Sequence, residues 1–221
     1  MMSRAGSWAT SSILASLLAA APLPAVTADE VLTGMEKAGR ALKTFFADFT
    51  QERVFVIAED RDERSGKFFY QAPGKMVWEF EKPSPRTVLI EPGKVSIYDP
   101  PLKQLQRQKL DETKSEFYII GFGGTKKNIT DKYEVELLDT STPPGSAAIH
   151  HLKLTPRWVE ESLFSKLELW VDGTSHLPAQ IKFYEKTTDE TTFRFVNSKV
   201  NPTLPASRFK LAPPPDTAII E

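Results

Sequence analysis

The apolar positions near the start of the chain follow a helical spacing. Asp29 can cap a helix, and apolar residues then recur every three or four positions over residues 30–43. These residues are Val31, Leu32, Met35, Ala38 and Leu42. They share one face, so the spacing predicts an amphipathic helix. Two glycines inside it, Gly34 and Gly39, each lower helix propensity by about 1 kcal/mol relative to Ala, which indicates that the helix depends on packing against another element.

After residue 43 the pattern changes to short β-rich runs, several of which alternate with a period of two. We predict eleven strands, at approximately 46–57, 63–71, 75–81, 86–91, 94–99, 103–108, 131–139, 148–155, 163–172, 178–186 and 190–198. The links are short and contain turn residues such as Pro73-Gly74 and Pro92-Gly93. Neighbouring strands should therefore be antiparallel, because a parallel crossover needs about a dozen residues or more.

Two segments do not fit the strand pattern. Residues 111–121 predict a short helix that ends in the loop 121–124, although the β-branched pair Ile119-Ile120 leaves a strand as the alternative. The proline-rich tail from Asn201 onward cannot form a central strand, so we predict an edge element or a strap.

The predicted elements together indicate a mainly β fold. Eleven meandering strands in one domain must curl, which predicts a single unclosed antiparallel β-barrel with α-helices as a lid across its mouth. Such a barrel is wider than the roughly eight strands whose interior side chains alone can fill, so we predict a hydrophobic cavity. An ordinary filled core is the alternative.

Alternating apolar side chains supply the candidate lining of this cavity. On the third predicted strand Met76, Trp78 and Phe80 share one face, and on the first strand Phe45 and Phe49 have the same parity. The predicted cavity residues are Met76, Trp78, Phe80, Phe45, Phe49, Ile97, Leu169, Phe183 and Phe195.

The first residues have the character of a secretory signal. Arg4 precedes an apolar stretch of roughly 14 residues, which is shorter than the roughly 20 that a membrane-spanning helix needs. Small residues at Val26 and Ala28 suit signal-peptidase cleavage after Ala28. We therefore predict that residues 1–28 are a cleaved signal peptide and that residues 29–221 form one domain exported to the periplasm, with an uncleaved anchor as the alternative.

Composition removes several function classes. The chain has no cysteine, so it has no disulfide, no thiolate nucleophile and no cysteine for lipid attachment at the first mature position, Asp29. Its net charge of −1 gives no reason to expect a nucleic-acid partner.

Enzyme chemistry has few candidates in this sequence. His150 and His151 are adjacent on a predicted strand and so point to opposite faces, and His176 lies in a turn. No HExxH, GxSxG or GxGxxG motif occurs. We expect neither an enzyme nor a cofactor or metal site, although a triad assembled from distant residues is not visible in sequence.

Several stretches, taken in order along the chain, resemble the LolA family of periplasmic lipoprotein carriers. They are Phe45-Phe46-Ala47-Asp48-Phe49-Thr50-Gln51, Gly66 with Phe68 and Tyr70, Pro73, Trp78-Glu79, Pro83, Gly93-Lys94, Tyr98-Asp99-Pro100 with Gln104, and Phe209 ahead of Pro213-Pro214. The resemblance implies an unclosed eleven-stranded barrel whose cavity holds lipoprotein acyl chains. It also implies two partners, an inner-membrane ABC-type lipoprotein release complex and an outer-membrane receptor or the outer membrane itself. We expect a monomer.

The resemblance also directs attention to the lid. We predict that Met35, Leu42, Phe117, Tyr118 and Ile120 form its inner face, with residues 121–124 as its hinge. Family members commonly carry an arginine just before the proline that corresponds to Pro73, and that arginine ties the lid shut. Here Ala72 stands in that place, so the lid is either looser or held by another group, for which Arg64 and Arg86 are candidates.

Two other functions remain open from the sequence. The same cavity would serve a carrier of another lipid or glycolipid. A protein-interaction module with an interior filled by its own side chains would show the same apolar alternation.

Overall fold

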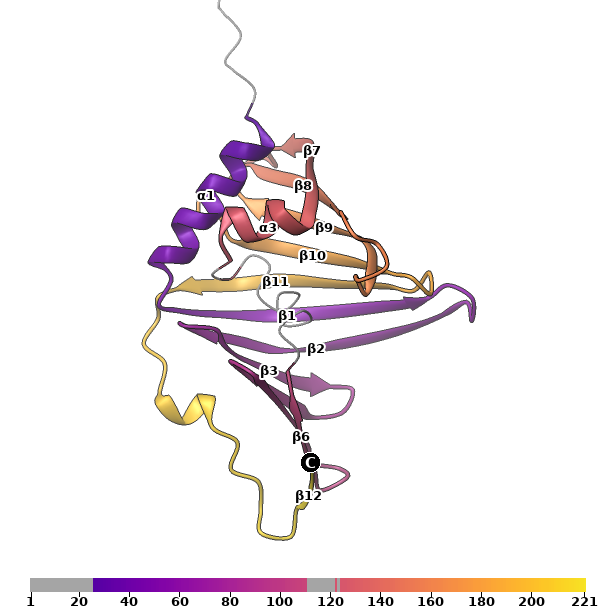
Figure 1. Ribbon diagram of the computed structural model, residues 1–221. Coiled ribbons are helices and arrows are strands. Elements are labelled where there is room, and N and C mark those ends of the chain that lie inside the picture. The colour runs from indigo at the N-terminus through magenta and orange to yellow at the C-terminus, as the bar shows by residue number, and fades with distance from the viewer. Residues whose placement is uncertain (1–25, 111–121, 123) are drawn as a thin grey trace, which may run out of the picture.

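The computed structural model describes residues 26–110, 122 and 124–221, and its strands form one curled sheet (Figure 1). The sheet has twelve strands in the order β12-β6-β5-β4-β3-β2-β1-β11-β10-β9-β8-β7. The strands are β1 (Thr44–Phe55), β2 (Asp60–Gln71), β3 (Lys75–Lys82), β4 (Arg86–Glu91), β5 (Lys94–Asp99), β6 (Gln104–Lys109), β7 (Tyr133–Ser141), β8 (Ile149–Pro156), β9 (Phe164–Asp172), β10 (Pro178–Glu185), β11 (Glu190–Val200) and β12 (Ala218–Ile220). This confirms the predicted unclosed barrel, because β7 and β12 are the two ends of the order and do not pair with each other.

Strand β1 lies in the middle of the sheet and joins its two halves. It pairs with β2 along its whole length and with β11, which comes from the far end of the chain, as in the pair Phe49 and Phe195. All eleven predicted strands are present, and all pairs among them are antiparallel. The twelfth strand, β12, was not predicted, and it pairs parallel with β6.

Helix α1 (Ala28–Ala41) is the predicted amphipathic helix, shifted by two residues at each end. The predicted cap at Asp29 is wrong, because Thr27 caps the helix through a capping box. The Glu30 amide donates to Thr27 Oγ1 at 3.2 Å, and the Thr27 amide donates to Glu30 Oε2 at 2.8 Å. The box satisfies two amide donors at once, whereas a lone aspartate satisfies one. Cleavage after Ala28 would remove this cap.

Helix α3 (Lys126–Lys132) was not predicted and lies beside α1 over one half of the sheet (Figure 1). Only Ile129 of this helix is buried, so its sequence carries no apolar periodicity to reveal it. The predicted helix at 111–121 lies outside the described residues. None of the described helices is long and apolar enough to span a bilayer.

The C-terminal segment forms both a strap and an edge element, the two alternatives predicted from the sequence. A 3₁₀ helix, η1 (Ala206–Phe209), lies against the convex face of the sheet, and the chain then runs to the edge strand β12 (Figure 1). Phe209 is buried with Phe69, Val77 and Leu89 in a small second core. The segment 201–221, called the strap below, therefore covers the face of β2–β6 that is opposite to the main core.

Candidate functional site

The concave face of the sheet carries the main hydrophobic core, and strand register brings its aromatic side chains into rows. Ala47, Phe68, Trp78 and Val88 are direct neighbours across β1, β2, β3 and β4. Since directly paired residues in a sheet project from the same side, this row faces the interior. A parallel row is formed by Phe45, Tyr70, Met76 and Ile90.

Trp78 lies at the centre of an aromatic cluster on this face. Its ring centroid is 4.4 Å from that of Phe68, 4.9 Å from Phe193 and 5.1 Å from Phe49. These are ordinary distances for tilted and edge-to-face aromatic pairs, which add to the burial of apolar area. We call the inward apolar residues of β1–β4 and β8–β11 the lipid face, a name for the role that we propose for them.

Eight of the nine predicted cavity residues belong to or pack against one core. Met76, Phe45, Phe49, Leu169, Phe183 and Phe195 are buried members of it, and Trp78 and Phe80 are half-buried and pack against it. Ile97 is the exception: it pairs with Val88 and so shares this face, but it is not among the described residues that pack on the core. That these side chains contact lipid stays a prediction.

The sequence alone did not single out two members of this cluster. Phe68 is fully buried, and its parity with Tyr70 on β2 could have indicated its inward direction. Phe122 is 2% exposed, and its ring lies 5.0 Å from Phe68 and 5.1 Å from Phe45. It comes from the segment between β6 and α3, where no periodicity signals the direction of a side chain, so only tertiary structure could reveal it.

Helix α1 closes one end of the lipid face, with Met35 (4% exposed) and Leu42 (3% exposed) directed into the core. Their role on the inner side of a lid stays a prediction. The other predicted lid residues, Phe117, Tyr118 and Ile120, lie outside the described residues, as do Gly121 and Gly123 of the predicted hinge.

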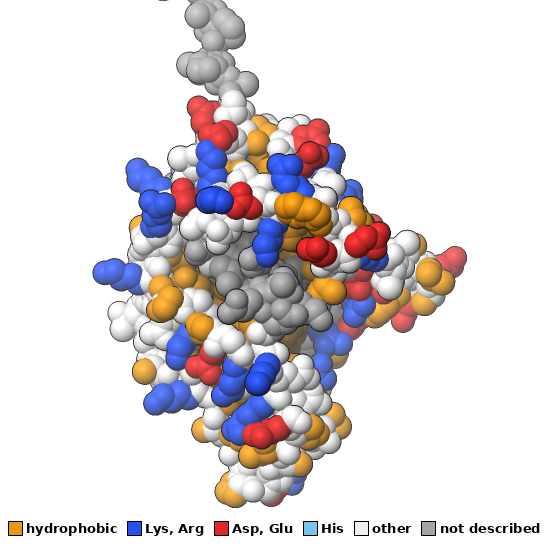
Figure 2. All heavy atoms as spheres, viewed as in Figure 1, with side chains coloured by type: hydrophobic (Ala, Val, Ile, Leu, Met, Phe, Trp, Pro, Cys, Tyr) orange, Lys and Arg blue, Asp and Glu red, His pale blue; other side chains and the backbone are white. Residues whose placement is uncertain are grey.

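Helix α1 packs its buried side chains on the core and makes polar contacts with α3. Figure 2 shows charged side chains of both signs on the outer surface around these two helices. Among them, Lys126 forms an ion pair with Asp29 and donates a hydrogen bond to Thr33 Oγ1 at 3.2 Å. Arg64 instead pairs with Asp62 at 2.8 Å and Arg86 with Asp99 at 2.8 Å. Among the described residues, neither arginine forms an ion pair or hydrogen bond with α1.

The lipid face changes from apolar to polar along its strands. Beyond Phe49, strand β1 places Gln51 and Arg53 on the same side, and Arg53 reaches Glu185 and Asp189 at 3.2 and 3.3 Å. Gln51 Oε1 and Arg53 Nε are buried and have no hydrogen-bond partner in the part of the chain that the structure describes. Near the other end Tyr70 is buried, and burial raises the pKa of its hydroxyl, so it is neutral there.

The histidines lie away from this face's aromatic centre and form no metal site. His150 is buried and contacts Thr140 Oγ1 at 3.0 Å, while His151 contacts Glu168 at 3.1 Å and stacks on Trp170. Their different partners agree with the predicted opposite directions. The described residues contain no group of three or more His, Cys, Asp or Glu placed to hold a metal ion.

Comparison with known proteins gives a family match over most of the chain. The model of the family described as outer membrane lipoprotein carrier protein LolA matches residues 40–212. An outer-membrane lipoprotein carrier protein of Bordetella avium is 26% identical over 93% of this chain and 93% of its own length. One of Methylococcus capsulatus is 27% identical over 81% of this chain and 82% of its own length.

Solved structures show the same fold at lower sequence identity. An uncharacterized conserved protein from Thermus thermophilus superposes with a TM-score of 0.58 at 15% identity, covering 87% of this chain and 98% of that one. At that identity the likeness concerns the fold alone. The family match, which spans β1 to the strap, concerns the sequence as well.

Proposed function

The chain belongs to the LolA family of outer membrane lipoprotein carrier proteins, and we propose that it carries the acyl chains of lipoproteins against its lipid face. The observation that supports the proposal most directly is the continuous aromatic cluster around Trp78 on the concave face of the sheet. Such a surface offers apolar contact on a scale suited to hydrocarbon.

The physical task of such a carrier is to keep fatty chains out of water. An acyl chain costs about 0.8 kcal/mol per methylene exposed to water, so an acylated protein needs its chains covered while it crosses an aqueous compartment. A carrier must also release its cargo, so binding should be only moderately favourable. The free energy needed to expose the buried residues of this face would oppose acyl-chain binding and so keep it moderate.

The described core residues of the lipid face are shielded from water, so the proposal includes an opening step. The core residues there are buried, and Phe122 is in ring contact with Phe45, Phe68 and Phe195. We propose that acyl chains enter where α1 and Phe122 now lie, and that α1 leaves the sheet as its ion pair to α3 breaks. The contact between Lys126 and Asp29 is on the outside of the helix and can break at low cost.

The place of action and the partners follow from the same proposal. A cleaved segment at residues 1–28 would deliver the domain to the periplasm, where cargo would arrive from an inner-membrane ABC-type release complex. Delivery would be to an outer-membrane receptor or to the outer membrane itself. The role is that of a carrier and not of an enzyme, with no cofactor required.

The test is the substitution Trp78→Glu at the centre of the lipid face. A buried carboxylate beside Phe49, Phe68 and Phe193 is costly in apolar surroundings, so we expect loss of capture of an acylated lipoprotein. Capture is measured by co-purification from detergent-extracted membranes, with Trp78→Ala as a milder variant in case Trp78→Glu lowers folding yield. Both variants should still be exported.

A matched control is available elsewhere in the chain. Trp158 lies in the β8–β9 loop with 57% of its surface exposed, so Trp158→Glu makes the same chemical change away from the lipid face. It should leave capture unchanged. Full capture by a folded Trp78→Glu or Trp78→Ala protein would contradict the proposal.

Burial of the described core residues also fits one rival function. A protein-interaction module with a permanently filled core would also show buried rings at Phe45, Phe68 and Phe122. Such a module would not bind a fluorescent fatty acid, whereas a carrier would. Mass spectrometry of lipids that co-purify with the protein would separate lipoprotein cargo from another lipid.

A further inference from the structure

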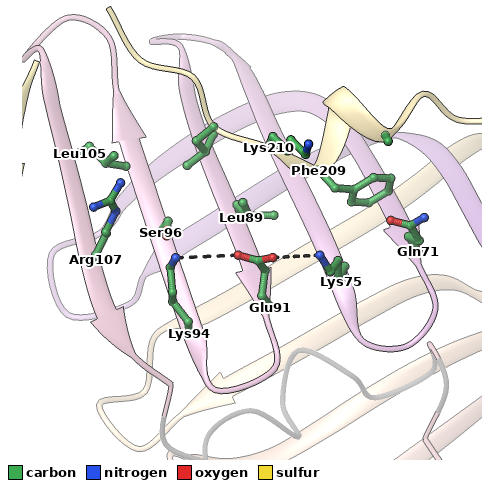
Figure 3. A pocket seen from close by; sticks show the side chains of 12 residues that line it. Gln71, Lys75, Leu89, Glu91, Lys94, Ser96, Leu105, Arg107, Phe209 and Lys210 are labelled. Atoms are coloured by element: carbon green, nitrogen blue, oxygen red, sulfur yellow. Dashed lines mark ion pairs between the residues drawn. The ribbon is translucent and has the colours of Figure 1, made fainter. Parts of the chain in front are cut away.

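A pocket on the convex face of the sheet, beneath the strap, gathers positive charge in a protein whose net charge is −1. Its volume is about 440 Å³, and Figure 3 shows its lining. Its four cations are Lys75, Lys94, Arg107 and Lys210, and its one carboxylate is that of Glu91. Its size is that of an ordinary small-molecule site.

Strand register fixes where these groups stand. On the convex face Lys75, Glu91 and Lys94 form one row across β3, β4 and β5, since Glu91 pairs with Lys94 in the register of β4 and β5. The next row along the strands contains Leu89 and Ser96, followed by Arg107 on β6. These side chains alternate with Ile90 and Val95 of the concave side, so the pocket is separated from the lipid face by the thickness of the sheet.

The positive charge of the pocket is only partly neutralised. Glu91 lies 3.0 Å from Lys75 and 4.0 Å from Lys94, so one carboxylate serves two lysines. Arg107 has only a loose contact, 3.6 Å, with the Glu221 carboxylate, which is 77% exposed. Lys210 has no carboxylate partner among the described residues. An added anion would therefore meet cations that the described carboxylates do not fully neutralise.

The remaining lining is apolar, apart from a buried hydroxyl and an amide. Leu89, Leu105 and Phe209 are each at most 5% exposed and Ser96 is 4% exposed, so the floor is largely shielded from water. A small inorganic ion would not need this apolar floor. A ligand with an apolar body and a phosphate head would use both parts, because a phosphate presents several acceptor oxygens to separate cationic donors and to the Ser96 hydroxyl.

We propose that this pocket beneath the strap binds an organic phosphate through Lys94, Arg107 and Lys210, with its apolar part against Leu89, Leu105 and Phe209. The source is either a soluble organic phosphate or the phosphate head of a lipid. The site is separate from the lipid face and does not depend on the function proposed above.

The experiment titrates the purified protein with phenyl phosphate, inorganic phosphate and benzyl alcohol at constant ionic strength, followed by amide NMR shifts. Phenyl phosphate should bind with a Kd of about 1 mM or tighter. Its shifts should centre on Ser96, Arg107 and Lys210. Inorganic phosphate and benzyl alcohol should each bind at least about ten-fold more weakly, since each offers half of the contacts. Equal binding of inorganic phosphate, or shifts centred elsewhere, would overturn the proposal.

A pair of double variants distinguishes specific binding in the pocket from general attraction to surface cations. The double variant Lys94→Gln and Arg107→Gln should weaken phenyl phosphate binding by at least about ten-fold. The control, Lys186→Gln with Lys37→Gln, removes the same net charge at exposed positions in the β10–β11 turn and on α1, outside the pocket. It should change binding by less than about two-fold, because exposed charges beyond about 8–10 Å are screened by salt. Equal loss in both double variants would also overturn the proposal.

Vesicles distinguish the two sources of the phosphate. If phenyl phosphate binds, the protein is next sedimented with phosphatidylglycerol vesicles. Co-sedimentation of the unmodified protein that is lost in the Lys94→Gln and Arg107→Gln variant would identify a lipid head as the ligand. Phenyl phosphate binding with no co-sedimentation that depends on these two residues would identify a soluble ligand. If the pocket responds neither to phenyl phosphate nor to the vesicles, the proposal is wrong.

Discussion

Individual residues determine where the strands can approach each other, and Gly66 is the clearest example. It lies where the register between β2 and β3 shifts by one residue, and it pairs with both Phe49 and Phe80. A Cβ at this position would be 1.9 Å from the main-chain oxygen of Glu79. The backbone of β3 therefore passes through the space that any other side chain would need.

The substitution Gly66→Ala should destabilise the protein strongly. Relieving the overlap requires a backbone shift in β3, which we expect to lower the free energy of unfolding by about 3 kcal/mol or more. Gly93→Ala is the control: its φ of +74° is unfavourable, but a Cβ there would have no atom within 4 Å. It should cost only about 1–2 kcal/mol. Urea unfolding of both variants measures the difference, and equal losses would show that the close approach is unimportant.

His150 is a second residue whose surroundings have a measurable consequence. Burial lowers the pKa of its imidazole, and the nearby His176 lowers it further, against the opposite effect of Asp172. The pKa is thus lower in the folded than in the unfolded state, where it is about 6.5. The unfolded state then binds more protons, so stability should be complete above about pH 6.5 and should fall as the pH decreases below it.

The measurement is the free energy of unfolding at several pH values from about 7.5 to 5. The variant His150→Gln should lose part of the acid-induced decrease, because the group responsible is gone. A pH profile with the same slope in this variant and in the unmodified protein would show that His150 does not cause the decrease.

At the scale of elements, the strap is attached to the sheet less firmly than the strands of the sheet are attached to each other. The strap is attached by Phe209 in a small core with Phe69, Val77 and Leu89, and by a three-residue strand on β6. It also makes exposed hydrogen bonds, such as that of Arg208 with Glu79 at 2.8 Å. An element with few buried contacts opens at lower free energy than the sheet beneath it. We therefore expect the strap to detach without unfolding the sheet.

Truncation of its anchor tests this expectation. Phe209→Ala removes about 1.5–3 kcal/mol of burial, which should raise the open population of the strap by about ten-fold or more. Limited proteolysis should then cut residues 202–217 at least about ten times faster, while the thermal midpoint of the sheet changes little. Leu211→Ala, at a half-buried position of the same strap, should have a smaller effect. A matching drop in the thermal midpoint would show that strap and sheet unfold together.

The elements also show how far the sequence reaches. The eleven strands could be predicted because period-two alternation and Pro-Gly links are local signals, and α1 because five apolar residues share one face. Helix α3 has a single buried residue, and β12 pairs through only three residues, so neither has a local signal. The cap at Thr27 was missed because the capping box overlaps the predicted cleavage site.

Across the whole molecule, the sequence indicated which residues would join the core better than it indicated how they would be arranged. Parity placed Met76, Trp78 and Phe80 on one face, but the convergence of Phe195, Phe68 and Phe122 depends on the pairing of β1 with β11 and on the path of the chain after β6. Long-range register is not encoded in local periodicity. The predicted cavity depends on the same long-range arrangement. In the structure the rings of Phe45, Phe68, Phe122 and Phe195 meet on the concave face.

This closed arrangement leads to a prediction for the molecule as a whole. If acyl chains replace Phe122 and the buried contacts of α1, binding should stabilise the folded protein by mass action, by about 2.7 kcal/mol at a free ligand concentration of about 100 Kd. Phe122→Ala should lower the stability of the empty protein by about 3–5 kcal/mol. The same variant should bind a fluorescent fatty acid at least about ten-fold more tightly than the unmodified protein does, since the competing side chain is absent.

Thermal unfolding with and without the fatty acid measures both effects on one sample. Tighter binding together with lower stability would identify Phe122 as an internal competitor of the cargo. A variant that is less stable but binds the fatty acid no better would show that Phe122 is a structural core residue, and would remove the proposed entry route between α1 and the sheet.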